Sequence, residues 1–259
     1  MLREPKSRNL YRGHAVALCG HIERPVPEII QTQAAAAISI SGGCDSARAE
    51  CFTHRDIVSF KSARSHVSGR ESSDGKYLET LATCVVEGLD ILGVVTAERV
   101  VGRLVGSHVV GTKGANPVVT PSGSYFQGLR VFGKEVKCDL IGHRFDALES
   151  KPNAAVSLRT DDKVKNQVIQ DEGWEAKGFL PISLWAAPPS VKDLPVNEDQ
   201  SWNREQNAIV IPHFGRIYLA EMIICCDSHR LTMLRVELGC PAEGGFDVCS
   251  VDGEPHIMP

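Results

Sequence analysis

The residues of this chain that could do chemistry lie in two short stretches. In the first, Asp139, His143 and Asp146 follow one another closely along the sequence. Asp139 and His143 would share one face of a strand, because strand side chains alternate between faces. Carboxylates with an imidazole can hold a divalent ion such as Ca²⁺ that polarises a carbonyl group or activates water. These three residues are therefore candidate metal ligands, with His143 as a candidate catalytic base. The alternative is an ion pair of Asp139 with Arg99 beside a surface histidine.

The second stretch holds His213, Glu221, Asp227 and His229. The turn CDSH would bring Asp227 and His229 to one end of a hairpin. His213 and Glu221, however, stand roughly 26 Å apart if the strand between them is straight at about 3.3 Å per residue. Only a bend near Gly215 could gather all four residues, so an unrelated set of surface residues is the alternative.

Motifs that mark common enzymes are missing from the chain. There is no G-x-S-x-G elbow, no phosphate-binding G-x-x-x-x-G-K-[ST] loop and no H-E-x-x-H zinc motif. The 259 residues carry a formal net charge of −4 with both signs mixed, which disfavours nucleic acid as a partner. No segment reaches the roughly 20 apolar residues of a membrane helix. As written, the chain is expected in the cytoplasm, with export if a leader is missing.

Cysteine usage indicates reduced thiols. The chain has nine cysteines, an odd number, and no C-x-x-C pair that could face two thiolates to one metal or to each other. We expect most of them to be buried and to behave as small hydrophobic residues. Cys44 and Cys51 could form a local disulfide in an oxidising compartment.

The elements that must position these residues are predicted to be mainly β. DIVSFKSARSHVSG from Asp56 alternates with period two, and residues 77–110 are rich in Val, Thr, Leu and Ile with too many glycines for a helix. One short helix is expected at residues 160–173. We predict an antiparallel sandwich or barrel-like sheet, with a short β-helix as the alternative.

The predicted domain organisation is simple. Residues 1–33, broken by prolines, are expected to be an irregular N-terminal arm, and residues 34–259 a single β-rich domain. Residues 174–207, which hold all three tryptophans, are predicted to be an excursion across the sheet. Residues 217–225 and 230–238 are predicted to be a buried antiparallel hairpin, with Leu219, Ile223, Leu234 and Val236 in the core.

The phrase CVVEGLDILG at residues 84–93 resembles SYFQGLRVFG at residues 124–133, at a constant offset of 40 residues. Strands with bends at equivalent glycines would give both copies, extended to 84–103 and 124–143, the same backbone path. Charges swap between the copies: Asp90 corresponds to Arg130, and Arg99 to Asp139. If equivalent positions lie opposite each other, these pairs become cross-strand ion pairs.

The phrases VVEGLDILG and YFQGLRVFG, with the ending VIPHFGRIYLAEMIICCDSHRLTMLRVELGCP, are similar to those of a group of uncharacterised bacterial proteins. The resemblance implies a bacterial origin and one intact fold, and it carries no activity or site residue with it. Two functions follow from the residues themselves. The first is a non-catalytic β-rich module that binds another protein or a glycan, or assembles with itself. The second is a metal-dependent, for example Ca²⁺-dependent, hydrolase of a small ester or lactone.

Overall fold

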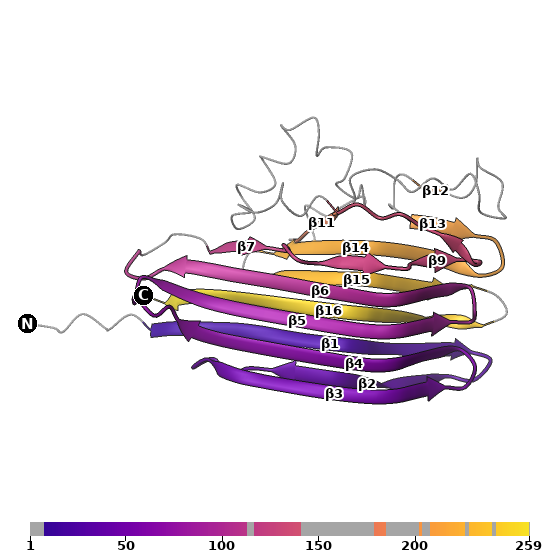
Figure 1. Ribbon diagram of the computed structural model, residues 1–259, viewed down its shortest axis with the longest axis horizontal. Helices are drawn as coiled ribbons and strands as arrows, with labels where there is room; N and C mark the ends of the chain where they lie inside the picture. The colour runs from indigo at the N-terminus through magenta and orange to yellow at the C-terminus, as the bar shows by residue number, and fades with distance from the viewer. Residues whose placement is uncertain are drawn as a thin grey trace, which may run out of the picture.

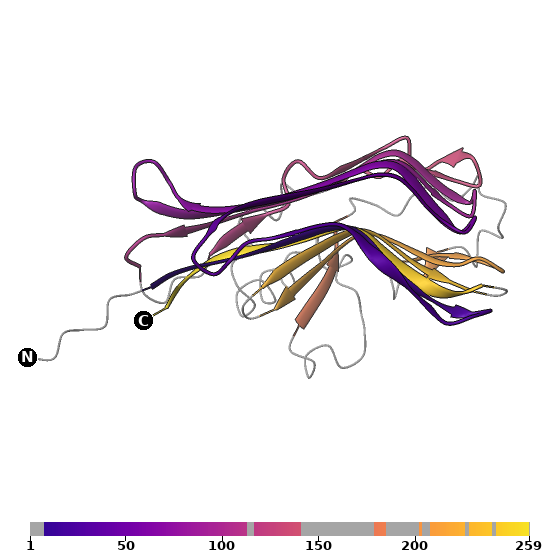
Figure 2. The same ribbon diagram turned by 90° about the horizontal axis from the view of Figure 1, so that it is seen from below.

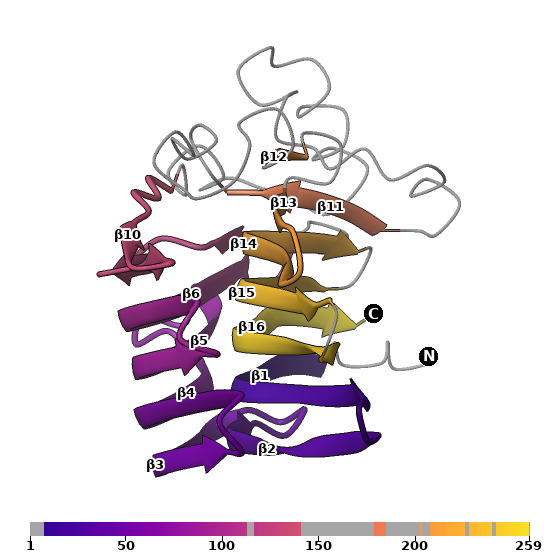
Figure 3. The same cartoon turned by 90° about the vertical axis from the view of Figure 1, so that its right-hand side faces the viewer.

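The computed structural model describes residues 8–112, 117–140, 179–184, 202–203, 208–225, 228–239 and 242–258. Within these residues, sixteen strands form two antiparallel sheets of eight strands each, packed face to face (Figures 1 and 3). The predicted antiparallel sandwich is confirmed. The β-helix alternative is wrong, because every strand pairing described is antiparallel and neither sheet closes on itself. The described residues contain no helix, and therefore no helix that could cross a membrane.

Sheet I contains the two ends of the described chain. In spatial order its strands are β12 (Trp202–Asn203), β13 (Ala208–Ile211), β14 (Gly215–Cys225), β15 (His229–Leu238), β16 (Glu243–Met258), β1 (Arg8–Arg24) and β2 (Glu28–Ala37), with β11 (Phe179–Ser183) also paired to β14.

Sheet II is built from the segment between β2 and the middle of the chain. In spatial order its strands are β10 (Lys134–Glu135), β9 (Arg130–Val131), β6 (Val95–Val109), β5 (Tyr77–Ile91), β4 (Val58–Glu71) and β3 (Gly43–His54), with β7 (Val118–Thr120) and β8 (Tyr125–Gln127) paired to β6. Across the sandwich, β16 packs on β5 and β6, β1 packs on β4 and β5, and β2 lies beside β3.

The expected irregular N-terminal arm is wrong over residues 8–33. These residues form β1 and most of β2, and β1 lies between β16 and β2. The glycines of β1 weakened its strand pattern in the sequence, and they occur where side chains or backbone of other strands approach closely. A Cβ on Gly13 would lie 2.5 Å from Val67 Cγ1, and one on Gly20 would lie 2.4 Å from the Gly245 carbonyl oxygen. Pro25 belongs only to the turn between the two strands.

A line of unpaired residues, the crease of sheet I, crosses this sheet. It consists of Ala34, Ala17, Cys249, Met233 and Ala220, one on each strand from β2 to β14, and the strand registers skip each of them. On every second strand the crease residue is left-handed, with φ of 45° at Ala34, 51° at Cys249 and 49° at Ala220. Like a β-bulge, the extra residue bends its strand and turns the following side chains over.

Sheet II has a corresponding crease made of Cys51, Lys61, Gly88, Glu98 and Gly128. The registers of β3, β4, β5, β6 and the β8–β9 segment skip these five residues in the same way. Again the crease residue on every second strand has left-handed backbone, with φ of 53° at Cys51, 65° at Gly88 and 60° at Gly128. Both sheets bend in the same direction, so one nests along the other (Figure 2).

The crease explains why one core prediction is wrong. The predicted hairpin is confirmed as β14 and β15, paired antiparallel, and Leu219, Leu234 and Val236 are buried. Ile223 is only partly buried. Since Ala220 reverses the alternation, Leu219 and Met222 face the core and Ile223 turns away from it.

Two thiols connect the sheets close to the creases. The Sγ atom of Cys84 in sheet II lies 3.5 Å from the Val16 carbonyl oxygen in sheet I, to which it donates. In return Cys249 in sheet I donates to the Val100 carbonyl oxygen in sheet II at 3.4 Å. Both side chains are completely buried, as expected for small hydrophobic thiols. Burial raises the pKa of Cys249 far above its ordinary value, and the neighbouring Cys84 raises it further.

The proposed local disulfide of Cys44 with Cys51 is wrong. Both cysteines are free and exposed, and they stand seven residues apart on the single strand β3. An extended chain places them roughly 23 Å apart, whereas a disulfide needs Cα atoms within about 7 Å. The predicted helix at residues 160–173 lies outside the described residues, as does most of the Trp- and Pro-rich stretch, of which β11 and β12 are described.

Replacing Leu234 by Ala should lower the free energy of unfolding by about 2–5 kcal/mol, because it leaves a cavity at a side chain with no exposed surface. Ile223→Ala is the matched control on the same hairpin and should cost clearly less, since Ile223 is only partly buried. Urea denaturation of both variants measures the difference. Equal losses would contradict the reversal of alternation at Ala220.

Replacing either Gly88 or Gly128 by Ala should lower the free energy of unfolding by more than about 1–2 kcal/mol, which is the usual cost of left-handed backbone in a residue with a side chain. A Cβ would also lie 2.6 Å from Lys61 Cγ at Gly88 and 2.6 Å from Glu98 Cγ at Gly128. Gly93→Ala is the control, because its φ is 64° and nothing lies within 4 Å of a Cβ there. Thermal or urea unfolding of the three variants tests this ranking, which a larger loss at Gly93 would contradict.

Candidate functional site

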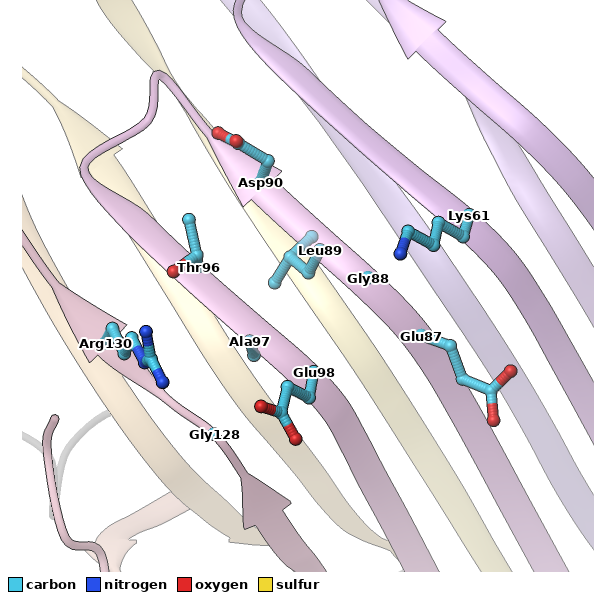
Figure 4. Close-up of a pocket in the computed structure, with 10 residues that line it drawn as sticks. All are labelled: Lys61, Glu87, Gly88, Leu89, Asp90, Thr96, Ala97, Glu98, Gly128 and Arg130. Carbon is cyan, nitrogen blue, oxygen red and sulfur yellow. The ribbon is translucent and has the colours of Figure 1, made fainter. Parts of the chain in front are cut away.

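A groove of about 540 Å³ lies on the outer face of sheet II, along the crease (Figure 4). Its residues come from β4, β5, β6 and the β8–β9 segment, which are neighbours in the sheet. Charged and small side chains alternate along it. The lining residues are Lys61, Glu87, Gly88, Leu89, Asp90, Thr96, Ala97, Glu98, Gly128 and Arg130.

Gly88 and Gly128, equivalent positions of the two similar phrases, lie at the floor of this groove. Gly88 and Gly128 both have positive φ, and so do the equivalent pairs Leu92 with Phe132 (55° and 50°) and Gly93 with Gly133 (64° and 73°). The strands around them differ, because β5 runs unbroken to Ile91 whereas the second stretch divides into β8 and β9. Residues 141–143, the end of the extended second copy 124–143, lie outside the described residues.

Glycine at these two places is explained by space rather than by φ alone. Ala34, Cys51, Ala220 and Cys249 adopt the same left-handed backbone in the creases although they carry side chains. At Gly88, in contrast, the stem of Lys61 occupies the position of a Cβ, and at Gly128 the stem of Glu98 does so. Each glycine therefore lets the long side chain of the neighbouring strand lie flat across it.

Glu87 closes one side of the groove and is held in place by its neighbours. Ser62 Oγ donates to it at 2.8 Å, and the Arg99 guanidinium donates to it at 2.5 Å from the directly opposite position on β6. The hydrogen bond from Ser62 lowers the pKa of Glu87, and the hydrogen bond and charge of Arg99 lower it further. This carboxylate is therefore ionised and already paired.

The other four charged lining residues make fewer hydrogen bonds and ion pairs than Glu87. The Glu98 carboxylate accepts one hydrogen bond from Gln127 at 3.3 Å, and one oxygen of Asp90 accepts from the Gly93 N–H at 2.7 Å. Lys61 and Arg130 make no ion pair within 4.0 Å in the part of the chain that the structure describes. The groove thus offers two cationic groups and two carboxylates that retain free hydrogen-bonding capacity.

The predicted charge-swap ion pairs are wrong. Asp90 and Arg130 do not face each other, because Thr96 of β6 pairs with both and separates them by one strand. Arg99 pairs with Glu87 rather than with Asp139. Equivalent positions of the two phrases lie two strands apart, since β6 runs between β5 and the β8–β9 segment.

The predicted metal cluster is not tested. Asp139 is exposed beyond β10, while His143 and Asp146 lie outside the described residues. No group of three or more His, Cys, Asp or Glu side chains in the described ranges could hold a metal ion. The metal-dependent hydrolase and the base role of His143 stay predictions.

The second predicted cluster is not assembled. His213 is exposed in the turn before β14, Glu221 lies mid-strand with the Arg235 guanidinium 2.7 and 2.9 Å from its two oxygens, and His229 lies at the far end of the hairpin. Asp227 lies outside the described residues. The bend occurs at Ala220, too far along β14 to bring His213 to His229.

Lys61 and Glu98 were not among the residues predicted from the sequence. They lie on β4 and β6, outside the two ten-residue phrases 84–93 and 124–133, and join Gly88 and Gly128 only through the strand register. The available signal was the pair of equivalent glycines, which marked β5 and the β8–β9 segment but not the strands beside them.

Fold and groove together define a two-sheet antiparallel β-sandwich with a charged, glycine-floored surface. The chain matches the family model described as a domain of unknown function (DUF8256) over residues 9–179, more than half of its length, and so belongs to this family. Every lining residue of the groove falls within the matched region. No curated protein and no solved structure matches the chain.

Ser62→Ala should raise the pKa of Glu87 towards the ordinary value of about 4.3, because it removes the largest cause of the lowering. A folded-state pKa below that of the unfolded chain stabilises the fold above the unfolded pKa, and this stabilisation is lost as the pH falls through the folded value. NMR titration of the Glu87 carboxyl in both proteins measures the change. An unchanged midpoint in Ser62→Ala would show that Arg99 alone sets this pKa.

Proposed function

We propose that this protein is a non-catalytic binding module whose groove takes an extended segment of another protein that carries both acidic and basic side chains. One observation carries the proposal: left-handed positions of the crease hold glycine where the stem of Lys61 or Glu98 lies flat across the backbone and places a charged group in the groove. Four other left-handed crease positions hold Ala or Cys. The backbone bend therefore does not require Gly88 and Gly128, whereas the placement of the Lys61 and Glu98 side chains across the crease does.

The size of the groove supports an extended segment. It spans four neighbouring strands, from Lys61 on β4 to Arg130 on β9. Strands lie about 4.8 Å apart, so this distance is roughly 14 Å, or about four residues of extended chain. A bound segment would cross the strands along the crease and lie against the Lys61 and Glu98 side chains.

The charges support a partner with both signs. Along the crease Lys61 is followed by Glu98, and two rows further towards the hairpin end Asp90 is followed by Arg130. A uniformly charged partner would meet repulsion at two of these four groups, whereas an alternating one can pair with each. A glycan is less favoured, because no lining residue is aromatic. Exposed ion pairs are weak, so affinity should be modest and should fall as salt rises.

The experiment selects the ligand and blocks the groove. A display library of random twelve-residue peptides is panned on the full chain and counter-selected on a variant with both Gly88→Asn and Gly128→Asn. Asparagine tolerates left-handed backbone, but its side chain must displace the stem of Lys61 at Gly88 or of Glu98 at Gly128, so the urea midpoint of each variant is measured first to show that it is folded. Gly93→Asn is the matched control, since it has the same φ and open space and does not line the groove.

We expect enriched peptides to contain both acidic and basic residues. Their affinity should fall at least tenfold in Gly88→Asn or Gly128→Asn and stay unchanged in Gly93→Asn, as measured by fluorescence anisotropy on folded protein. The proposal fails if no peptide is enriched, or if enriched peptides bind the groove-filled variants as well as they bind the unmodified chain.

A further inference from the structure

The outer face of sheet II carries a second surface, independent of the groove and of the function proposed for it. This surface, the apolar face, lies between the crease and the end of the sheet where β5 begins and β6 ends, and it faces the viewer in Figure 1. Inward and outward residues alternate along both strands here, so the register identifies the outward set. Its apolar members are Tyr77, Leu81 and Val85 on β5, Val101, Val105 and Val109 on β6, Val118 on β7 and Tyr125 on β8.

Several of these apolar side chains are open to solvent. Tyr77, Val109, Val118 and Tyr125 expose between 37% and 47% of their surface, although each lies beside other apolar residues of the same face. Scattered apolar residues on a surface need no explanation, whereas contiguous ones mark an interaction site. The apolar face is therefore a candidate interface.

The outward residues of β5 and β6 form alternating apolar and polar rows. From the end of the sheet towards the crease, the five rows are Tyr77 with Val109, Glu79 with Ser107, Leu81 with Val105, Thr83 with Arg103, and Val85 with Val101. The order of the rows is the same from both ends. The face is thus symmetric in polarity about its central row, that of Leu81 and Val105.

The two polar rows carry opposite charges. The Glu79 carboxylate lies 3.6 Å from Arg70 of β4, but 41% of the Glu79 side chain and 78% of the Arg70 side chain remain exposed, so this ion pair is weak. Arg103 in the other polar row is exposed, and its guanidinium has no acid within 4.0 Å among the residues that the structure describes. Its stem lies beside Gly123 of the neighbouring turn, where a Cβ would be 3.2 Å from the arginine Cδ. An arginine between two apolar rows is thus available to a carboxylate of a partner.

We propose that the apolar face binds the same face of a second copy of the chain, through a two-fold axis that lies in the interface and crosses the strands at the central row. Such an axis keeps each strand opposite itself and reverses the order of the rows. Apolar rows then meet apolar rows, and Arg103 meets the row that contains Glu79 of the second copy. Symmetry repeats this contact, so the interface holds two such charge pairs.

The charges select this axis over an axis parallel to the strands. A parallel axis would set each row against itself, with Arg103 opposite Thr83 of the second copy, and would bring no opposite charges together. With the crossing axis, Arg103 faces Ser107 of the second copy. Glu79 of that copy then lies one strand away, or about 4.8 Å, within reach of an arginine side chain.

The size of the face indicates a weak dimer. Tyr77 and Val85 stand eight residues apart, or roughly 26 Å at about 3.3 Å per residue, and three neighbouring strands at about 4.8 Å give a width of about 14 Å. Each copy would therefore bury roughly 400 Å², about half of the roughly 800 Å² of a standard interface. We expect the dimer to dissociate on dilution. None of the residues that line the groove belongs to the five rows, so the groove stays open in the dimer.

Sedimentation velocity of the full chain over a hundredfold range of concentration measures this association. We expect monomer at the lowest concentration and dimer at the highest. Val105→Asp places a carboxylate in the central row of both copies and should raise the dissociation constant at least tenfold. Arg48→Glu is the matched control, because Arg48 is exposed on β3 and lies outside the five rows. This variant should leave the dissociation constant unchanged.

Exchanging the charges tests the axis. Arg103→Glu and Glu79→Arg should each weaken the dimer at least fivefold, because like charges then meet at both symmetric contacts. The double variant brings opposite charges together again and should regain the dissociation constant of the unmodified chain. The urea midpoint of each variant is measured first to show that it is folded.

Three results would overturn the proposal. The first is an unmodified chain that stays monomeric at every concentration, which would leave the face to a different protein. The second is a folded Val105→Asp variant that associates as tightly as the unmodified chain, which would place the dimer elsewhere. The third is a double charge variant that associates no better than the single ones. If Val105→Asp does not fold, Arg103→Glu decides in its place, since Arg103 is exposed.

Discussion

The extra residue that each long strand inserts at the crease lets a bent strand keep one face buried along its whole length. With strict alternation, residues of one parity face the core throughout, and a bend would carry part of them away from the opposite sheet. At Ala220 the left-handed backbone reverses the alternation, so that Leu219 before it and Met222 after it are both buried. A strand cannot do this alone, because its neighbours must skip a pairing in the same row. The crease is therefore a property of the whole sheet, and the core, the bend and the nesting of the two sheets depend on it.

The same backbone feature has opposite chemical results in the two sheets. Both sheets bend in one direction, so one crease faces the partner sheet and the other faces solvent (Figure 2). In sheet I the crease residues are buried, and Met233 and Cys249 approach Gly102 of sheet II, where a Cβ would lie 3.0 Å from Met233 Cγ. The thiols of Cys84 and Cys249 donate across the sandwich, so each of these weakly polar S–H groups has a carbonyl acceptor in the other sheet. In sheet II the crease residues Lys61 and Glu98 are exposed, and the groove forms where glycines lie between them.

The charged groups of the groove and the buried Glu254 differ in how solvent treats them. In the groove the charged groups are partly or fully exposed, so water and salt screen them, and their contribution is selection of a complementary partner more than tight binding. At the end of sheet I, Glu254 is removed from water and lies 3.3 Å from the equally buried Nδ1 atom of His229, so this pair is much less screened. The family match covers β1 and all of the groove but ends before β16, so Glu254 lies outside the matched region.

Local sequence was sufficient for the strand content and for the hairpin of β14 and β15, because runs of β-branched and apolar residues with turn residues between them report local backbone preference. It also marked Gly88 and Gly128 as equivalent bends, and both are left-handed. It failed on β1, where glycines that allow close packing resemble loop residues, and on Ile223, because alternation along one strand cannot report a bend that all strands make together. The arrangement of Lys61 beside Gly88 and of Glu254 beside His229 was likewise decided only by tertiary structure. Each of these pairs joins strands that lie side by side through register, and register depends on how whole sheets pair and pack.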